Sequence, residues 1–196
     1  MDSRAEILDA AERLISEHGF GSMRMASLIK VSGHSSSSIY WHFESKEGVL
    51  AAVLERAVDR FFERAALLRF PDDDDVRSRL EWFLRESMAL TLQAPQFLRL
   101  FILQGLLRND YDRGEAGVVG RVRAQALRNL TRGLAEALRP WGEEQAAEVA
   151  AAIVGPALML FDGAFLDTQV RLGRIEDADA RLLAAALTGM AVAARR

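Results

Sequence analysis

The sequence contains no cysteine, which excludes disulfide frameworks, thiol nucleophiles and cysteine-ligated zinc or iron–sulfur centres. Only 4 prolines and 14 glycines occur among its 196 residues, which argues against collagen, proline-rich linkers and loop-rich β architectures. No uninterrupted apolar run reaches the roughly 20 residues of a membrane span, and the N-terminus MDSRAEILDAAERL lacks the apolar segment of a secretory signal. We therefore expect a soluble, cytoplasmic protein without a membrane partner.

The sequence also lacks a strong excess of either charge. Its formal net charge is -3, which provides no general attraction for nucleic acid or anionic membranes. Lysine occurs only at Lys30 and Lys46, whereas arginine is abundant. Half of the residues are hydrophobic and 27% are charged, an ordinary globular balance. A surface that binds nucleic acid would have to be a local feature.

Helical periodicity runs through most of the chain, with apolar residues recurring three and four positions apart. Ser3 with Glu6 resembles a capping box, Ser45 and Asp75 are suited to cap later helices, and Pro156 predicts a kink. The pattern predicts an all-α fold of about nine helices. They are expected at about residues 3–18, 24–31, 35–41, 46–68, 75–92, 95–107, 115–138, 143–170 and 176–194.

Two short predicted helices, joined by a turn at Ser32-Gly33 and preceded by a longer helix, form a helix-turn-helix pattern. The second short helix is narrow enough to enter a DNA major groove, which is about 12 Å wide. Short helices around a glycine also occur as plain connectors. The pattern alone therefore leaves both interpretations open.

The residues of this segment carry a more specific signal. The block Ile39-Tyr40-x-His42-Phe43-x-Ser45-Lys46-Glu47-x-x-Leu50, with Gly19-Phe20 and Gly33 before it, resembles the N-terminal DNA-binding domain of the TetR family of bacterial transcriptional regulators. The resemblance covers about residues 3–55. It implies a helix-turn-helix domain at 1–48 and a helical ligand-binding and dimerisation domain at 49–196.

Several positions depart from the family pattern, among them the pair Leu28-Ile29, where the family has isoleucine and alanine. Arg24 replaces the usual threonine before the second helix, and Ser37 replaces a small glycine or alanine in the third. His34 stands where the family normally has an apolar residue. It is either a satisfied core histidine or a polar contact near DNA.

The candidate DNA contacts combine this resemblance with the chemistry of the side chains. Serine hydroxyls suit phosphates or base edges but discriminate bases poorly, and the first serine of the run is expected to cap its helix. The resemblance assigns Tyr40 and Lys46 to phosphate groups, and Trp41 to a sugar or a thymine methyl group. His42 either packs beside Phe43 or contacts phosphate. The full set is Arg24, Ser35, Ser36, Ser37, Ser38, Tyr40, Trp41, His42 and Lys46.

Charge supports this assignment only locally. Between residues 18 and 46 the ionic side chains are Arg24, Lys30 and Lys46 against Glu44, a net charge of +2 (three cations less one anion). The acidic residues of the first helix are expected to lie away from the groove. The three histidines, at 18, 34 and 42, lack metal-ligand spacing, so we expect no metal site and no cofactor.

The last two predicted helices are rich in alanine and glycine alongside leucine, isoleucine and methionine. Small residues allow helices to approach closely, and the family resemblance implies a homodimer interface formed by these two helices of each subunit. Two-fold symmetry would match a palindromic operator. The alternative is that these helices pack only within one chain.

The resemblance further implies a pocket for a small apolar effector in the middle of the second domain. Ligand binding there would change the separation of the two helix-turn-helix domains of the dimer and release a repressor from its operator. Arg123 and Asp162 could anchor polar ligand groups if they were buried. The candidate lining residues, which could equally be ordinary core, are Trp82, Phe83, Met88, Phe97, Phe101, Gln104, Phe161 and Phe165.

Rival functions find less support in the sequence. It contains no nucleophile elbow, Walker motif, Rossmann glycine pattern or HExxH motif, so we expect no enzyme. The acidic run Asp72–Asp75 is better explained as a solvated turn than as a divalent-ion site. The remaining alternative is a helical binding or adaptor protein of the same fold that does not bind an operator.

Overall fold

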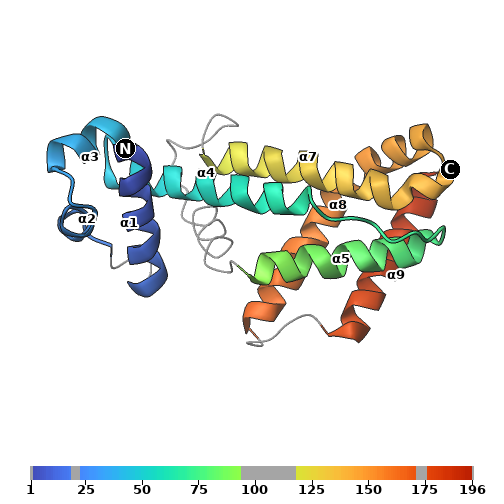
Figure 1. Cartoon of the computed structure of the whole chain (residues 1–196). Helices are drawn as coiled ribbons and strands as arrows, with labels where there is room; N and C mark the ends of the chain where they lie inside the picture. Colours follow the sequence, from blue (N-terminus) through green and yellow to red (C-terminus); the bar gives the residue numbers. More distant parts are fainter. Residues whose placement is uncertain (1, 19–22, 94–117, 171–175, 196) are drawn as a thin grey trace. The chain divides into compact units, whose positions relative to one another are not determined.

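The computed structural model describes residues 2–18, 23–93, 118–170 and 176–195 (Figure 1). These residues form helices and connections without any strand, which confirms the all-α prediction for the part of the chain described. The predicted helix at 95–107, the sixth of the nine, lies outside these residues. The elements are α1 (Ser3–His18), α2 (Met25–Ser32), α3 (Ser36–Phe43), α4 (Lys46–Ala65), α5 (Val76–Leu92), α7 (Val118–Leu138), the 3-10 turn η3 (Arg139–Trp141), α8 (Glu143–Val170) and α9 (Asp177–Ala194).

The chain divides into two compact units. The first consists chiefly of residues Met1–Arg60, and the second of Phe61–Pro95 with Gly120–Arg196. The long helix α4 begins in the first unit and ends in the second. Each unit has its own hydrophobic core.

The core of the first unit is built from one apolar face of each of its four helices. The predicted face of α1 is buried, and α4 contributes a stripe of aliphatic residues. The two short helices contribute less, because each is only eight residues long. The largest side chains in this core are Ile7, Leu8, Leu14, Ile15, Met23, Leu28, Ile39, Phe43, Leu50 and Leu54.

The start of α1 differs from the capping box expected at Ser3 and Glu6. Asp2 caps the helix instead, because its Oδ1 accepts hydrogen bonds from the backbone N–H groups of Arg4 (3.0 Å) and Ala5 (3.4 Å). Ser3 is already the first helical residue. The Ser3 and Glu6 side chains are thereby left to contact other helices.

The second unit packs α5, α7, α8 and α9 around alanine and leucine side chains, with Leu134, Ala150 and Ala184 among the fully buried residues. Small residues let the helix axes come close. The tightest fit is between Gly133 and Phe83, since a Cβ at Gly133 would lie 2.2 Å from the Phe83 Cζ atom.

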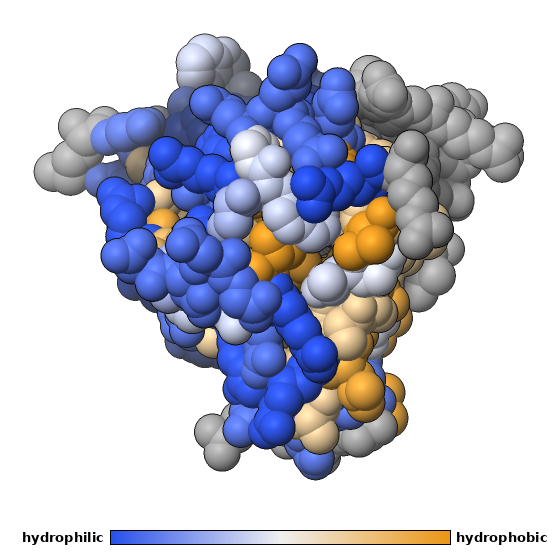
Figure 2. Space-filling view, turned by 90° about the vertical axis from the view of Figure 1, so that its right-hand side faces the viewer, coloured by the Kyte–Doolittle hydropathy of each residue, from blue (hydrophilic) through white to orange (hydrophobic). Residues whose placement is uncertain are grey.

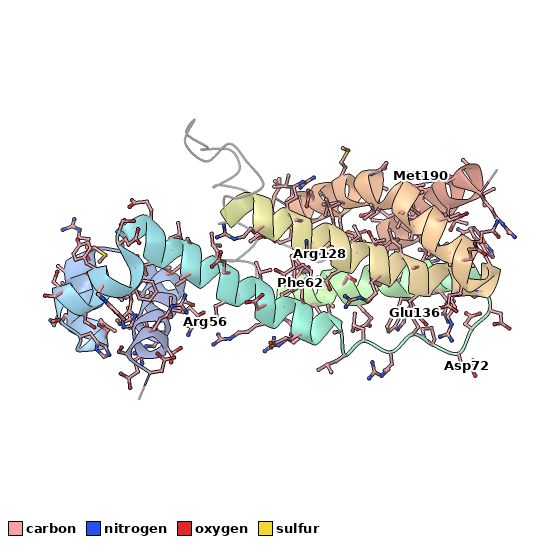
Figure 3. All side chains as sticks on the ribbon, turned by 90° about the horizontal axis from the view of Figure 1, so that it is seen from above. Arg56, Phe62, Asp72, Arg128, Glu136 and Met190 are labelled. Atoms are coloured by element: carbon pink, nitrogen blue, oxygen red, sulfur yellow. The ribbon has the colours of Figure 1, made fainter. Side chains whose placement is uncertain are left out.

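A buried arginine connects the segment before α5 to the end of α7 through hydrogen bonds. The Arg79 guanidinium donates to the backbone carbonyls of Pro71 (3.0 Å), Asp73 (3.3 Å), Glu136 (2.7 Å) and Ala137 (3.2 Å). The last two are among the terminal carbonyls that an α-helix leaves without intrahelical partners. Asp72 and Glu136 mark this junction in Figure 3. Arg79 thus bonds mainly to backbone groups, with one longer contact of 3.5 Å to the Glu136 carboxylate.

The acidic run forms the turn that the sequence predicts. Asp75 is the N-cap of α5 and accepts hydrogen bonds from the backbone and side chain of Ser78 at 3.0 and 2.8 Å. These hydrogen bonds lower the pKa of Asp75 below its ordinary value, because they stabilise the ionised carboxylate. Asp73 supports the turn by accepting from the Asp75 N–H at 2.8 Å.

Helix α8 continues through Pro156 for 28 residues. Its length and composition alone would let it cross a membrane, although 33% of its most apolar window is buried inside the chain. A core helix of a soluble protein passes the same test.

Candidate nucleic-acid interface

The turn between α2 and α3 uses the residues that its geometry requires. Gly33 has φ of 73°, a left-handed conformation that glycine adopts at little cost, and its N–H donates to the Ile29 carbonyl at 3.1 Å. Ser35 then caps α3 by accepting from the Ser38 N–H at 3.2 Å. The expected capping role of Ser35 is confirmed.

Helix α3 has one buried and one exposed face. Ile39 and Phe43 lie one turn apart and are buried in the first core. Ser36, Ser37, Tyr40 and Trp41 are exposed. Four of the predicted DNA contacts therefore share a single surface.

Trp41 is the most conspicuous member of this surface. It is 80% exposed, whereas Trp82 and Trp141 are both partly buried against the second core. Its indole ring meets the His42 ring edge-on, with centroids 4.6 Å apart. A large apolar ring left in water on a short helix points to a binding partner.

A strained turn connects α3 to α4. Glu44 has φ of 62°, which a non-glycine residue adopts only at a cost, and the Ser45 N–H donates to the Phe43 carbonyl at 2.6 Å. Ser45 caps α4, as expected, by accepting from the Gly48 N–H at 3.0 Å. A Cβ on Gly48 would lie 1.8 Å from the Phe43 carbonyl oxygen, so only glycine fits there.

Lys46 is the first residue of α4, and its side chain is half-buried. At this position it lies at the N-terminus of a 20-residue helix, the positive end of the helix dipole. A cation and helix amides at the same end favour an anionic partner such as a phosphate.

Both histidines of this region contact α1. His34 is half-buried, and its Nε2 lies 2.9 Å from Glu6 Oε2. His42 Nε2 lies 2.7 Å from Ser3 Oγ, and its ring centroid is 5.8 Å from that of Phe43. His34 is therefore a satisfied histidine, and His42 packs beside Phe43 as one of the two alternatives proposed.

An ionic cluster joins the other half of α1 to α4. Arg56 donates to Asp9 Oδ1 at 2.9 Å and to Glu12 Oε1 at 2.8 Å, and Arg60 approaches Glu12 Oε2 at 3.0 Å. Figure 3 labels Arg56 where α4 passes α1. The sequence predicted only that these acidic residues lie away from the groove. It could not identify their partners, because the pairing depends on how α4 lies against α1.

The remaining candidate contacts are less well placed. Arg24 is exposed and forms the N-cap position of α2, but its side chain makes no capping hydrogen bond. Ser38 is half-buried and follows the exposed pair in α3.

The candidate ligand-binding residues that the structure describes lie on α5 and α8. Met88 and Phe165 are fully buried, Phe83 is nearly so, and Trp82 and Phe161 are half-buried. Phe97, Phe101 and Gln104 lie outside the described residues. These burials are compatible with an ordinary core as well as with a pocket wall.

Ionic residues of the second unit pair with one another. Arg123 contacts Asp162 at 3.2 Å, and both side chains are partly exposed rather than buried. Arg85 bonds to Glu81 and Asp177, and these hydrogen bonds raise its pKa. Among the described residues, no group of three or more histidine or acidic side chains could hold a metal ion.

Comparison with known proteins gives a consistent result for the first unit. Residues 7–53 match the sequence model described as bacterial regulatory proteins, tetR family. The chain is 34% identical over 77 residues to the HTH-type transcriptional repressor ComR of Escherichia coli K12, which covers 39% of this chain and 37% of that protein. It is 38% identical over 74 residues to the HTH-type transcriptional regulator UidR of the same strain, covering 36% and 38%. The chain thus spans less than two fifths of the length of these relatives.

Solved structures extend the similarity of fold to nearly the whole chain. A TetR transcription regulator from Haloarcula marismortui superposes with a TM-score of 0.67 at 19% identity, over 98% of this chain and 97% of that one. A putative tetR transcriptional regulator from Streptomyces avermitilis gives a TM-score of 0.59 at 25% identity, over 99% and 98%. The helical second unit therefore has counterparts in structures that also carry the helix-turn-helix.

Proposed function

We propose that this chain, which belongs to the TetR family of bacterial regulatory proteins, binds double-stranded operator DNA as a homodimer and represses transcription in the cytoplasm. A small apolar effector bound in the second unit would release it. The observation that carries the proposal is the exposed Trp41 on the outer face of α3.

The surface around Trp41 has the chemistry expected for a major groove. Its indole ring can pack on a sugar or a thymine methyl group, and the hydroxyl groups of Ser36 and Ser37 can donate to or accept from base edges. Tyr40 and Lys46 supply a hydroxyl and a cation for the flanking phosphates. Phosphate contacts fix the register of the helix, whereas base contacts provide specificity.

A titration of DNA from the promoter region beside the chain's own gene tests this proposal. Binding should weaken steeply with salt, because phosphate contacts release counterions. Lys46→Ala removes one such contact from each subunit of the dimer, so the slope of log K against log salt should fall by about 1.8, or about 0.9 for each contact. Tyr40→Phe should weaken binding by a smaller factor. Arg64→Ala, which removes an exposed cation in the last turn of α4, should leave the slope unchanged.

Two outcomes would contradict the DNA-binding proposal. If Lys46→Ala left the slope of log K against log salt unchanged, Lys46 would not be a phosphate contact. Failure of the intact chain to bind any promoter fragment would favour the helical adaptor protein without operator binding.

The homodimer is supported by the apolar surface of α8 and α9. Val170 is 81% exposed and Leu182 is 70% exposed. Exposed alanine and glycine residues on the same helices would allow a second chain to approach closely. Figure 2 shows hydrophobic side chains gathered in a band along one edge of the face it presents. The other large exposed apolar residues of these helices are Met159, Leu166 and Val192.

Sedimentation equilibrium tests the dimer. The intact chain should sediment as a dimer at micromolar concentration, and Leu182→Glu should yield monomers because it places a charge in an apolar contact. Leu67→Glu is a matched control, since Leu67 is also 70% exposed but follows α4 rather than lying on α8 or α9. A monomeric wild-type chain would overturn this part of the proposal.

Thermal shift tests the effector. The buried Met88 and Phe165 and the half-buried Phe161 suit an apolar ligand. A compound that binds the folded chain raises its melting temperature, and one that also lowers operator affinity would be the effector. A screen of apolar compounds without any shift would indicate that these side chains are only core.

A further inference from the structure

Both ends of α3 are attached to α1 by side-chain hydrogen bonds. His34 precedes the helix by two residues and meets Glu6 at 2.9 Å, while His42 in the last turn meets Ser3 at 2.7 Å. Ser3 and Glu6 are one helical turn apart on α1. A single stretch of α1 therefore holds the start and the end of the proposed recognition helix.

The apolar core alone gives α3 a weak anchor. Only Ile39 and Phe43 of its eight residues are buried, and apolar contacts are not directional. Hydrogen bonds depend steeply on distance and angle. Two of them at opposite ends therefore restrict rotation of α3 about its axis, which is the motion that would turn Trp41 away from a groove.

The chemistry of the first contact is defined by Glu6. An ionised carboxylate only accepts hydrogen bonds, so the Nε2–H of His34 must donate. A hydrogen bond to a charged acceptor is stronger than a neutral one. The side chains are 21% exposed for His34 and 41% for Glu6, so the pair is partly shielded from water.

The second contact acts next to the exposed indole. His42 hydrogen-bonds to Ser3 and also meets the Trp41 ring edge-on. His42 contacts both Ser3 and Trp41. Loss of the Ser3 hydroxyl group would therefore free the imidazole to move, and with it the Trp41 ring that is proposed to reach the bases.

We infer that His34 with Glu6, and His42 with Ser3, are positioning residues that set the orientation of α3 and thereby the specificity of operator binding. This inference rests on the proposed DNA binding. It assigns a role in recognition to Ser3 and Glu6, which lie on α1 rather than on the helix that would enter the groove.

The direction in which one substitution changes the affinity for DNA tests the inference. Removing an acidic side chain from a DNA-binding unit should, by charge alone, tighten binding to any DNA. For Glu6→Ala we instead expect about tenfold weaker binding to the operator, the size expected for loss of one charge-assisted hydrogen bond. Binding to a scrambled duplex should stay equal or become tighter.

Matched variants separate positioning from charge and from folding. Glu6→Gln keeps an acceptor for His34 and should retain operator affinity within about threefold, because most of the hydrogen bond is preserved. Glu63→Ala removes an exposed carboxylate from α4 and should change neither affinity. The double variant Glu6→Ala/His34→Ala should bind no more weakly than Glu6→Ala, since the two residues act as a pair.

Ser3→Ala provides a second test that removes only one hydroxyl group. It should lower the ratio of operator to scrambled-duplex affinity, and Ser3→Thr, which restores the hydroxyl, should recover it. Equal losses for operator and scrambled DNA in both Glu6→Ala and Ser3→Ala, or no loss in either, would overturn the inference.

An NMR measurement on the free protein distinguishes failure of the inference from failure of the proposed function. Imidazole ¹⁵N shifts should show His34 protonated at Nε2 in the wild type and altered in Glu6→Ala. That signature without operator binding would refute only the proposed function. Operator binding with an unchanged specificity ratio in the variants would refute only the positioning role.

Discussion

The two units of this chain hold their helices together by different means. In the first unit, polar side chains of α1 bond to side chains of neighbouring elements, as in the pairs His34–Glu6 and Arg56–Glu12. In the second, side-chain pairs such as Arg123–Asp162 are partly exposed, whereas the buried Arg79 bonds mainly to backbone carbonyls and alanine residues fill much of the core. Directional side-chain pairs fix the orientation of short helices, whereas small residues allow long helices to pack closely without fixing a unique partner surface.

This difference agrees with what each unit exposes. The first presents one tryptophan on a short helix, whose angle would have to be fixed for the proposed entry into a groove. The second exposes apolar side chains along two long helices, where a broad contact tolerates small adjustments. Substitutions at these contacts should therefore destabilise the two units to different degrees, with the largest effect expected at the turn into α4.

Gly48→Ala should be the most damaging substitution. The new Cβ would lie 1.8 Å from the backbone oxygen of Phe43, which cannot move without breaking the turn into α4. We expect a loss of about 4 kcal/mol or more in the free energy of unfolding and loss of operator binding. Urea denaturation measures the first and a DNA titration the second.

The neighbouring Glu47→Ala is the control for that experiment. Glu47 is exposed in the first turn of α4, so its replacement should cost no more than about 0.5 kcal/mol through the helix dipole. Equal stabilities of the Gly48→Ala and Glu47→Ala variants would refute the tight approach at this turn.

Arg79→Met should destabilise the second unit by about 3 kcal/mol, because it leaves buried carbonyl groups without donors. Arg77→Met, at an exposed position in the same turn of α5, should change stability by less than about 0.5 kcal/mol. Chemical denaturation followed by circular dichroism measures both. If Arg79→Met lowered the free energy of unfolding no more than Arg77→Met does, the Arg79 hydrogen bonds would not stabilise this unit.

Gly133→Ala tests the close packing of the second unit. Its Cβ would meet the Phe83 ring, a side chain that can shift, so we expect a smaller cost of about 2 kcal/mol. The double variant Gly133→Ala/Phe83→Leu should cost less than the sum of the two single changes, because the smaller side chain makes room. Strict additivity in thermal unfolding would contradict this contact.

Asp75→Ala should have the smallest effect, about 1 kcal/mol, through loss of a helix cap. Because folding lowers the pKa of Asp75, its contribution is present above the unfolded pKa of about 4 and is lost as the pH falls through the lower folded value. The difference in stability between wild type and Asp75→Ala should therefore shrink as the pH falls below the ordinary pKa of an aspartate. Asp74→Ala, at an exposed neighbouring position, should not show this change.

Local signals in the sequence were sufficient to predict most of the described helices. The predicted helix at 143–170 coincides with α8, and the caps at Ser45 and Asp75 are present because a cap depends only on residues three positions away. The exposed and buried faces of α3 follow equally from its periodicity.

The sequence could not predict contacts between distant residues. Ser3 and Glu6 fit a capping box by spacing, yet their partners are His42 and His34, which lie 39 and 28 positions away. The signal available was the polar His34 at a position that is usually apolar in the family. A polar residue at a half-buried site needs a partner, and that need could have directed attention to the acidic face of α1.

The junction of Phe43 to Gly48 has a consequence for how the chain can vary. The Phe43 carbonyl oxygen, at the end of α3, accepts a hydrogen bond from the Ser45 N–H and also lies against Gly48 in the first turn of α4. The end of α3 and the start of α4 are therefore in direct backbone contact. A residue inserted at Glu44-Ser45 would break both contacts and thereby change the orientation of α3 relative to the start of α4. Substitutions at exposed positions further along α4 would leave this link intact.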